Sequence, residues 1–194
     1  GLFDLTPFSK FEIKSDKAHQ ELQKICTANI KNEPGKCVYT HMLNPDGGIE
    51  TDLTVVCIDK NHFRIISSAA TRERDKFHIN KHLSKNIELK DITDDLCVFG
   101  LFGPKSRDLL KTLSEDNFEN DQFRFGFAKF ITIDGVKIWT QRLSYVGELG
   151  YELYVDLKDA KKIYELLIEK GKDFNLSNCG MHAMDIMRME SGFL

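Results

Sequence analysis

Apolar and polar positions in the first half of the chain follow two spacings, one typical of strands and one typical of helices. Alternation predicts strands at residues 8–15, 37–43, 49–58, 63–69 and 87–93. Ser15 and Asp16 are suited to cap a helix with an apolar face, and a second, charged helix is expected at residues 71–83. The order of elements in this half is therefore strand, helix, hairpin, strand, helix, with one more strand at residues 87–93.

The second half repeats this order of elements. Strands are expected at residues 95–103, 127–133, 136–144 and 150–157, and helices at residues 105–113 and 156–170. Pro104 suits the start of the first of these helices, and Gly171 suits the end of the other. The chain closes on the helical pattern RMESGFL without a capping residue, so a fragment of a longer protein is expected.

Two short segments carry strong turn chemistry and decide how the strands pair. The sequence Asn-Pro-Asp-Gly-Gly at residues 44–48 and the pair Asp134-Gly135 each separate two predicted strands. Hairpins make neighbouring strands antiparallel, which indicates an α+β fold of two lobes with mainly antiparallel sheets and flanking helices. We place the first lobe at residues 1–90 and the second at residues 91–194.

The composition is that of a folded chain in a reducing compartment. Hydrophobic residues make up 41% and charged residues 29%, which allows a sizeable core and argues against disorder. The net charge of -3 argues against dedicated nucleic-acid binding, and no apolar run is long enough for a membrane helix. The 5 cysteines are scattered, as in proteins kept reduced. We expect a cytoplasmic protein, or a mitochondrial matrix protein in a eukaryote, with no nucleic-acid or membrane partner.

Several common sites are disfavoured. His78 and His82 have zinc-ligand spacing on a predicted helix, but the glutamate of H-E-x-x-H is missing and no third ligand lies nearby. Cys179 and His182 likewise lack a partner pair. No dinucleotide, P-loop or serine-hydrolase motif occurs, so we expect no metal site and no nucleotide fold in this chain.

Two stretches are less ordinary. In the strand at residues 49–58, alternation places Glu50 and Asp52 on one face, either because that face is wet or because the carboxylates act on a ligand. In the segment LSYVGELGYELYV, Gly147 and Gly150 interrupt a strand-forming context beside Glu152. Those glycines indicate a wide turn, a positive φ or the close approach of another group.

Several motifs in order resemble the folate-binding aminomethyltransferase family, which includes the T-protein of glycine cleavage. The matching pieces are FDLTPFSKFEI, YTHMLNPDGGIETDLTV, GLFGPKSRDLL, SYVGELGYELYV and HAMDIMRMESG. They span nearly the whole chain. The form YVGELGYELYV is more similar to the branch fused to flavin-dependent dimethylglycine and sarcosine dehydrogenases than to the free-standing T-protein.

The resemblance implies transfer of a one-carbon unit to tetrahydrofolate, forming 5,10-methylenetetrahydrofolate from a glycine-cleavage or methylglycine-type donor. It assigns Asp52 as the catalytic acid, Tyr145 and Glu152 as the pair that holds the pterin, and Tyr39 and Leu43 as further residues near the folate. A carboxylate can accept both neighbouring donors of a reduced pterin, and charge-assisted hydrogen bonds are about twice as strong as neutral ones. An acid beside the reacting nitrogens can take a proton from the attacking amine.

The resemblance also sets what lies outside the chain. Family members carry an N-terminal segment and a C-terminal β-rich domain, which we expect to lie outside the given sequence, and Met184 stands where several T-proteins have an arginine. FAD is expected only if a dehydrogenase domain precedes this chain. The implied partners are folate and a small amine-derived one-carbon donor, with a fused flavin domain or a lipoyl carrier protein as macromolecular partners.

Two alternatives stay open at this point. One is a non-catalytic folate-binding module, similar to relatives that assist iron–sulfur cluster assembly and carry a KGCYxGQE-type motif farther along their chains. The other is a demethylase that uses a different methyl donor. The regular segment GGIETDLTV around Asp52 favours the transferase.

Overall fold

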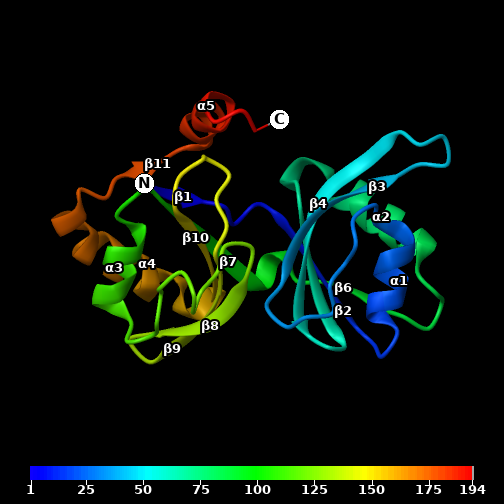
Figure 1. Ribbon diagram of the computed structural model, residues 1–194, viewed down its shortest axis with the longest axis horizontal. Coiled ribbons are helices and arrows are strands. Elements are labelled where there is room, and N and C mark those ends of the chain that lie inside the picture. Colours follow the sequence, from blue (N-terminus) through cyan, green and yellow to red (C-terminus); the bar gives the residue numbers. More distant parts are fainter. Residues whose placement is uncertain (194) are drawn as a thin grey trace. The chain divides into compact units, whose positions relative to one another are not determined.

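The structure, a computed structural model, describes residues 1–193 and divides into two compact units. One unit is Pro7–Thr93, and the other joins Gly1–Thr6 to the described residues from Asp94 onward. Each unit pairs one mainly antiparallel sheet with helices, so the predicted α+β class is confirmed (Figure 1).

The Pro7–Thr93 unit is built on a 5-stranded antiparallel sheet. In spatial order its strands are β3 (Cys37–Leu43), β4 (Ile49–Asp59), β5 (His62–Ser67), β2 (Ser9–Lys14) and β6 (Leu89–Asp91). Its helices are α1 (Ala18–Ile25) and α2 (Arg72–His82), with a 3-10 turn η1 (Ala69–Thr71) before α2 and η2 (Thr93–Asp95) at the boundary of the two units. The predicted strand at residues 87–93 is therefore shorter than expected.

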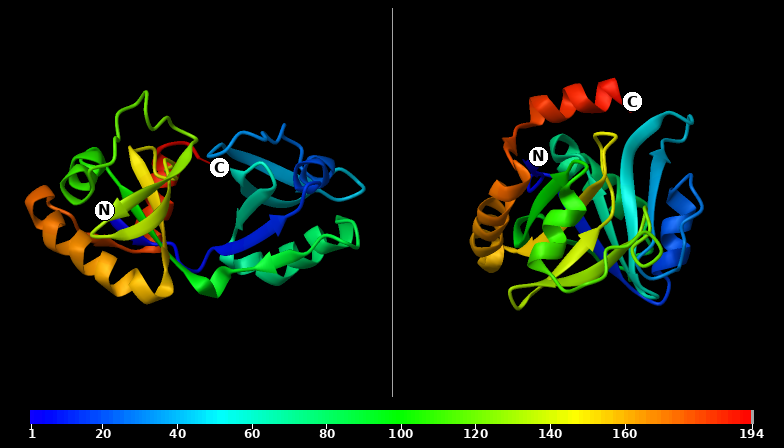
Figure 2. Two further views of the ribbon diagram at one scale, coloured as in Figure 1. Left: turned by 90° about the horizontal axis from the view of Figure 1, so that it is seen from below. Right: turned by 60° about the vertical axis from the view of Figure 1, so that its left-hand side comes forward.

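The β3–β4 hairpin confirms the turn predicted at residues 44–48. Asn44 Oδ1 accepts hydrogen bonds from the backbone N–H of Asp46 at 3.1 Å and of Gly48 at 2.8 Å. Gly47 has φ +81°, which an L-residue rarely adopts. Asparagine and glycine thus close a long two-stranded ribbon (Figure 2).

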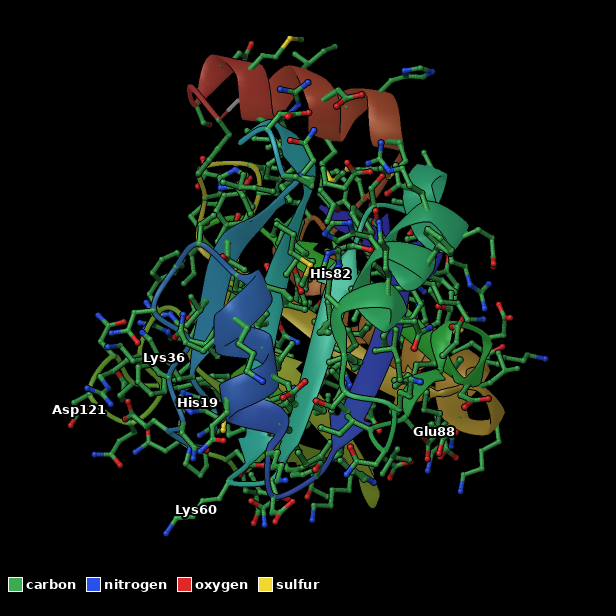
Figure 3. All side chains as sticks on the ribbon, turned by 90° about the vertical axis from the view of Figure 1, so that its right-hand side faces the viewer. His19, Lys36, Lys60, His82, Glu88 and Asp121 are labelled. Atoms are coloured by element: carbon green, nitrogen blue, oxygen red, sulfur yellow. The ribbon has the colours of Figure 1, made fainter. Side chains whose placement is uncertain are left out.

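One face of this sheet carries the core of the unit, because alternate side chains point to it. The residues buried there come from the strands and both helices: Phe11, Ile13, Ala18, Leu22, Leu53, Val55, Phe63, Ile65 and Ile79. Figure 3 shows α1, which carries His19, and α2, which ends at His82, lying over this face. The opposite face of the sheet is free of helices of its own unit.

The other unit is built on a 6-stranded sheet. In spatial order its strands are β11 (Asn178–Cys179), β1 (Leu2–Asp4), β7 (Leu96–Phe102), β10 (Gly150–Asp156), β9 (Val136–Gln141) and β8 (Ala128–Ile133). Only the β1–β11 pair is parallel among the described strands. Its helices are α3 (Ser106–Leu113), α4 (Leu157–Gly171) and α5 (Met181–Glu190), with a 3-10 turn η3 (Lys172–Phe174).

Helices α3 and α4 cover one face of the 6-stranded sheet (Figure 1). The core between them includes Leu101, Leu109, Leu110, Ile131, Ile138, Tyr151, Leu153, Ile163 and Leu167. The β8–β9 turn at Asp134-Gly135 has φ values of 47° and 77°, the positive pair that two-residue hairpins need. The second predicted hairpin is therefore confirmed.

The first residues of the chain belong to the sheet of the later unit, although they come first in the sequence. The sequence interpretation grouped them with the first lobe, but β1 pairs with β7 and β11 in the later unit. The division into lobes at residues 1–90 and 91–194 stays a prediction. Among residues 1–193 no helix has the length and apolar character to cross a bilayer, and all 5 cysteines are free thiols.

Candidate functional site

The sequence-predicted site residues fall in both units, and each group is described by itself. Asp52 lies on β4, directly opposite His41 of β3, on the face away from α1 and α2. Its carboxylate is exposed, and Tyr39 Oη donates a hydrogen bond to Oδ2 at 3.2 Å. The structure therefore brings Asp52 and Tyr39 together.

Aromatic side chains surround Asp52 on this face. The His41 ring packs edge-on against Tyr39, with 5.3 Å between ring centroids. Tyr39 is 59% exposed, and Leu43 and Ile49 are exposed near the hairpin tip. We name Tyr39, His41, Leu43 and Asp52 the hairpin patch. It offers an acid beside ring and aliphatic surface that a flat ligand could contact.

A second acid on the same sheet face is fully paired. Glu12 of β2 accepts hydrogen bonds from Arg64 Nη2 at 2.8 Å and Nε at 3.2 Å, and His62 Nε2 lies 3.0 Å from its Oε2. Burial by itself would raise the pKa of Glu12. The hydrogen bonds from His62 and Arg64, with the charge of Arg64, outweigh burial and lower the pKa to about 2.

Glu152 lies on β10 in the other unit, on the sheet face opposite α3 and α4. Its cross-strand neighbours are Gly100 of β7 and Gln141 of β9. Burial raises the pKa of Glu152 to about 7, and a 2.8 Å hydrogen bond from Tyr154 Oη opposes the rise only in part. A carboxyl group in this state is a candidate for binding or proton transfer.

The neighbours of Glu152 on β7 are apolar. Gly100 contributes no side chain, and the space above it is filled by other residues. A Cβ added to Gly100 would lie 2.8 Å from the ring of Phe102 and 2.9 Å from Leu5. The sheet face is therefore apolar on the β7 side of Glu152, where a carboxylate is poorly solvated.

Tyr145 lies in the loop between β9 and β10, where α5 holds it. Its ring is 5.8 Å from that of Phe193 and 6.0 Å from the guanidinium of Arg188. Ser191 Oγ donates to the carbonyl oxygen of Val146 at 3.0 Å, which fixes the loop against the end of α5 (Figure 2).

The two glycines of this loop are required by close approach, one of the readings left open above. Gly147 has φ +72°, and a Cβ there would lie 2.2 Å from Ser191 Oγ. A Cβ at Gly150 would lie 2.5 Å from the Phe102 ring. A larger side chain at either position would displace α5 or β7.

Tyr154 and Gln141 were missed by the sequence interpretation. Alternation along GYELYV could have found Tyr154, since Glu152 and Tyr154 must share a face. Gln141 could not have been found, because its position opposite Glu152 follows from the β9–β10 register.

The remaining candidate sites gain nothing from the structure. No group of three metal-ligating side chains occurs among residues 1–193, and the His78 and His82 rings simply contact each other at 4.6 Å. A cavity of about 210 Å³ near the start of α3 is lined by Phe102, Lys105 and Leu176 among others. None of the predicted site residues lines that cavity.

Comparison with known proteins gives matches along the whole chain. It is 35% identical over 193 residues to a 4-methylaminobutanoate oxidase (formaldehyde-forming) of Paenarthrobacter nicotinovorans, covering 99% of this chain and 23% of that protein. It is 33% identical to the mitochondrial dimethylglycine dehydrogenase of Rattus norvegicus, covering 100% of this chain and 23% of that protein. It is 31% identical to an aminomethyltransferase of Halothermothrix orenii, covering 100% of this chain and 54% of that protein.

The chain thus spans about half the length of the aminomethyltransferase and about a quarter of the other two proteins. Among solved structures, aminomethyltransferase T of the glycine cleavage system from Bartonella henselae superposes with a TM-score of 0.86 at 21% identity. That match covers 100% of this chain and 51% of the other, and at this identity it establishes the fold. The family model described as the GCVT N-terminal domain matches residues 1–194, so the chain belongs to that family.

Proposed function

We propose that this chain is the folate-binding part of an enzyme that transfers a one-carbon unit to tetrahydrofolate. The product would be 5,10-methylenetetrahydrofolate, and the donor a glycine-cleavage or methylglycine-type amine. Family membership supports the proposal, together with relatives named as an aminomethyltransferase and a dimethylglycine dehydrogenase.

The observation that carries the proposal is the state of Glu152. Within residues 1–193 its carboxyl group receives one hydrogen bond, from Tyr154, and burial raises its pKa to about 7. A buried carboxyl group of this kind is stabilised when a ligand supplies the missing donors. The Glu12 carboxylate, by contrast, already has Arg64 and His62.

A reduced pterin fits these requirements. Its 2-amino group and the adjacent ring N–H are two donors side by side, and a carboxylate can accept both through charge-assisted hydrogen bonds. Phe102 and Leu5 over Gly100 give the apolar surroundings in which such bonds are strong. When bound, the folate supplies the nitrogens that receive the carbon unit.

Asp52 is the proposed catalytic acid. It is exposed on the hairpin patch, so a ligand can reach it without displacing a protein partner other than Tyr39. There it would take the proton released when the folate amine attacks, an effect typically worth about 10²–10⁴-fold in rate. Tyr39 would hold the Asp52 carboxylate in place.

The other predicted residues would shape the folate site. Tyr145 offers a ring supported by Phe193 and Arg188, and Leu43 offers an exposed apolar surface. FAD would be needed only by a dehydrogenase domain outside this chain, and a fused flavin domain or a lipoyl carrier protein would deliver the one-carbon donor. The proposed location is the cytoplasm, or the mitochondrial matrix in a eukaryote.

The direct test is calorimetric titration of tetrahydrofolate, without oxygen, into this chain and into the complete gene product. The proposal predicts a single binding site in the complete protein, and formation of methylenetetrahydrofolate from a methylated amine or an aminomethyl carrier. Absence of tetrahydrofolate binding to the complete protein would refute it. Binding without transfer from any donor would instead support a folate-binding module without catalysis.

A further inference from the structure

Tyr154 is the polar neighbour of Glu152 and lies almost out of solvent. It is 3% exposed, and its hydroxyl donates to Glu152 Oε2 at 2.8 Å. The two residues are one alternation apart on β10 and therefore share a sheet face. This contact restricts the side-chain torsions of Glu152 before any ligand arrives.

Packing holds the Tyr154 phenol in position. In the sheet register Trp139 of β9 lies directly opposite it on one side and Val98 of β7 on the other. Both are buried, and Trp139 in turn packs edge-on against Phe130 with 4.9 Å between ring centroids. The hydroxyl is thus directed by side chains that have little freedom to move.

The Tyr154 contact leaves much of the Glu152 carboxylate available. Each carboxylate oxygen has two lone pairs, so Oε2 can accept from Tyr154 and from one further donor while Oε1 accepts another. On the β7 side the neighbour is Gly100, and the side chains that fill the space at Gly100, Phe102 and Leu5, are apolar and do not compete for the carboxylate oxygens. A ligand with two parallel N–H donors can therefore approach a carboxylate whose orientation is already set.

We propose that Tyr154 is a positioning residue for pterin binding, whose hydroxyl orients the Glu152 carboxylate toward the two N–H donors of the ligand. The proposal rests on the proposed function, in which Glu152 holds the pterin. Nothing in the resemblance or in the sequence interpretation assigned a role to Tyr154. Its contribution is pre-organisation, because Glu152 does not have to be ordered by the ligand itself.

Because the cross-strand neighbours of Glu152 are uncharged, the effect of Tyr154 on its pKa can be measured. On the same face β9 presents Gln141 and Trp139, β7 presents Gly100 and Val98, and none of these side chains titrates. Within residues 1–193 no ion pair involves Glu152, so its pKa reflects burial, which raises it, and the Tyr154 hydrogen bond, which lowers it. Removing that hydroxyl must move the pKa of Glu152 upward.

The test is tetrahydrofolate calorimetry on the complete gene product carrying Tyr154→Phe, repeated from about pH 5.5 to about pH 9. Loss of a hydrogen bond to a charged group predicts about 10-fold weaker binding near neutral pH. The pH at which affinity falls should rise by about one unit, because Glu152 then ionises less readily. Glu152→Gln is run in parallel and should remove this pH dependence.

Tyr151→Phe is the matched control. It removes a hydroxyl from the same strand, but Tyr151 points to the α3–α4 face, where its oxygen accepts from Arg107 Nε at 3.2 Å. It should leave both affinity and pH profile unchanged. Trp139→Phe is a second variant that keeps the Tyr154 hydroxyl and loosens its packing, and it should shift both readouts in the same direction by less.

The outcomes separate this proposal from the one on which it rests. Weaker binding together with an upward pH shift in Tyr154→Phe supports the positioning role. Weaker binding with an unchanged pH profile, or unchanged binding while Glu152→Gln fails to bind, overturns it and leaves the folate site standing. If Tyr154→Phe does not fold, an unchanged pH profile in Trp139→Phe overturns the positioning role. Unchanged binding by Glu152→Gln overturns the folate site itself.

Discussion

Glu12 and Glu152 are the same residue type in the same kind of place, yet their carboxyl groups are in opposite states. Each lies on the sheet face that the helices of its own unit leave uncovered. Glu12 is held by Arg64 and His62, and its pKa is lowered to about 2. Glu152 has Tyr154 alone within residues 1–193, and burial raises its pKa to about 7.

The contrast distinguishes a carboxylate that stabilises the fold from a carboxyl group that is suited to bind a ligand. The Glu12 side chain is 11% exposed but has its charge matched, so ionisation stabilises the folded chain. Glu152 is partly exposed as a residue, but its carboxyl group has no cation beside it within residues 1–193, so its ionised form is destabilised until a ligand brings donors. A partly satisfied carboxyl group kept at some expense of stability is what a binding site requires.

The largest effect is expected for a third acid, Asp52, which is exposed rather than buried. Asp52→Asn in the complete gene product should lower the rate of methylenetetrahydrofolate formation by about 10²–10⁴-fold, since it removes the proton acceptor. The rate is measured with saturating tetrahydrofolate. Glu50→Gln, which removes a carboxylate of the same strand that faces Arg74 of α2, should retain nearly full activity. Equal losses in the two variants would contradict the assignment.

The next largest effect is on the free energy of unfolding, which the two glutamate substitutions should change in opposite directions. At about pH 8, Glu12→Gln should lower the free energy of unfolding by about 2–4 kcal/mol, because it removes the carboxylate that pairs with Arg64. Glu152→Gln should raise the free energy of unfolding by about 1–3 kcal/mol, because it removes a buried charge. Urea denaturation measures the free energy of unfolding of both variants. Changes of the same sign would contradict the proposed difference between Glu12 and Glu152.

In the unsubstituted protein, Glu12 and Glu152 should also contribute oppositely to the pH dependence of the free energy of unfolding. The folded-state pKa of Glu12 is depressed, so its stabilisation is present above the ordinary value of 4.5 and is lost as pH falls toward about 2. The folded-state pKa of Glu152 is raised, so stability is greatest below 4.5 and declines as pH rises through about 7. Denaturation curves of each variant against pH identify the two contributions.

Ligand binding should depend on the same titration. Glu152 must lose its proton to accept two donors, so tetrahydrofolate affinity should fall about tenfold per pH unit below about pH 7. Above that pH the affinity should level off. Calorimetry in buffers of different ionisation enthalpy also counts the proton released on binding. A flat affinity between about pH 5.5 and about pH 8 would contradict an ionising Glu152.

The smallest effect is expected from Tyr39→Phe. The Tyr39–Asp52 hydrogen bond is 3.2 Å long and exposed, so water can replace it. We expect a two- to fivefold lower transfer rate and unchanged tetrahydrofolate affinity, in contrast to the buried Tyr154. A loss as large as that of Asp52→Asn would give Tyr39 a direct part in the chemistry.

Most of the fold could be predicted because local signals agreed with the tertiary structure. Turn residues at 44–48 and Asp134-Gly135 fixed both hairpins, and alternation fixed which side chains of β4 face the core. The sequence was less informative where strand pairing determines the unit to which a segment belongs. Leu2–Asp4 is too short to show a period, and it joins the later sheet through β7 and β11.

The candidate site was predicted in part for the same reason. Asp52, Tyr145 and Glu152 lie in motifs, so a resemblance could point to them without any geometry. The state of Glu152 could not be predicted, because it depends on Gly100 and Phe102 from a distant strand and on a missing cation. Charge balance at a buried position is a property of the folded sheet rather than of a motif.

The most direct measurement is the tetrahydrofolate affinity of Glu152→Gln beside that of Glu12→Gln, in the complete gene product at about pH 8. Loss of a charged acceptor at the folate site predicts about 10- to 100-fold weaker binding for Glu152→Gln. Glu12→Gln, although less stable, should bind within about threefold of the unsubstituted protein. Full affinity in Glu152→Gln, or equal losses in the two variants, would contradict the account.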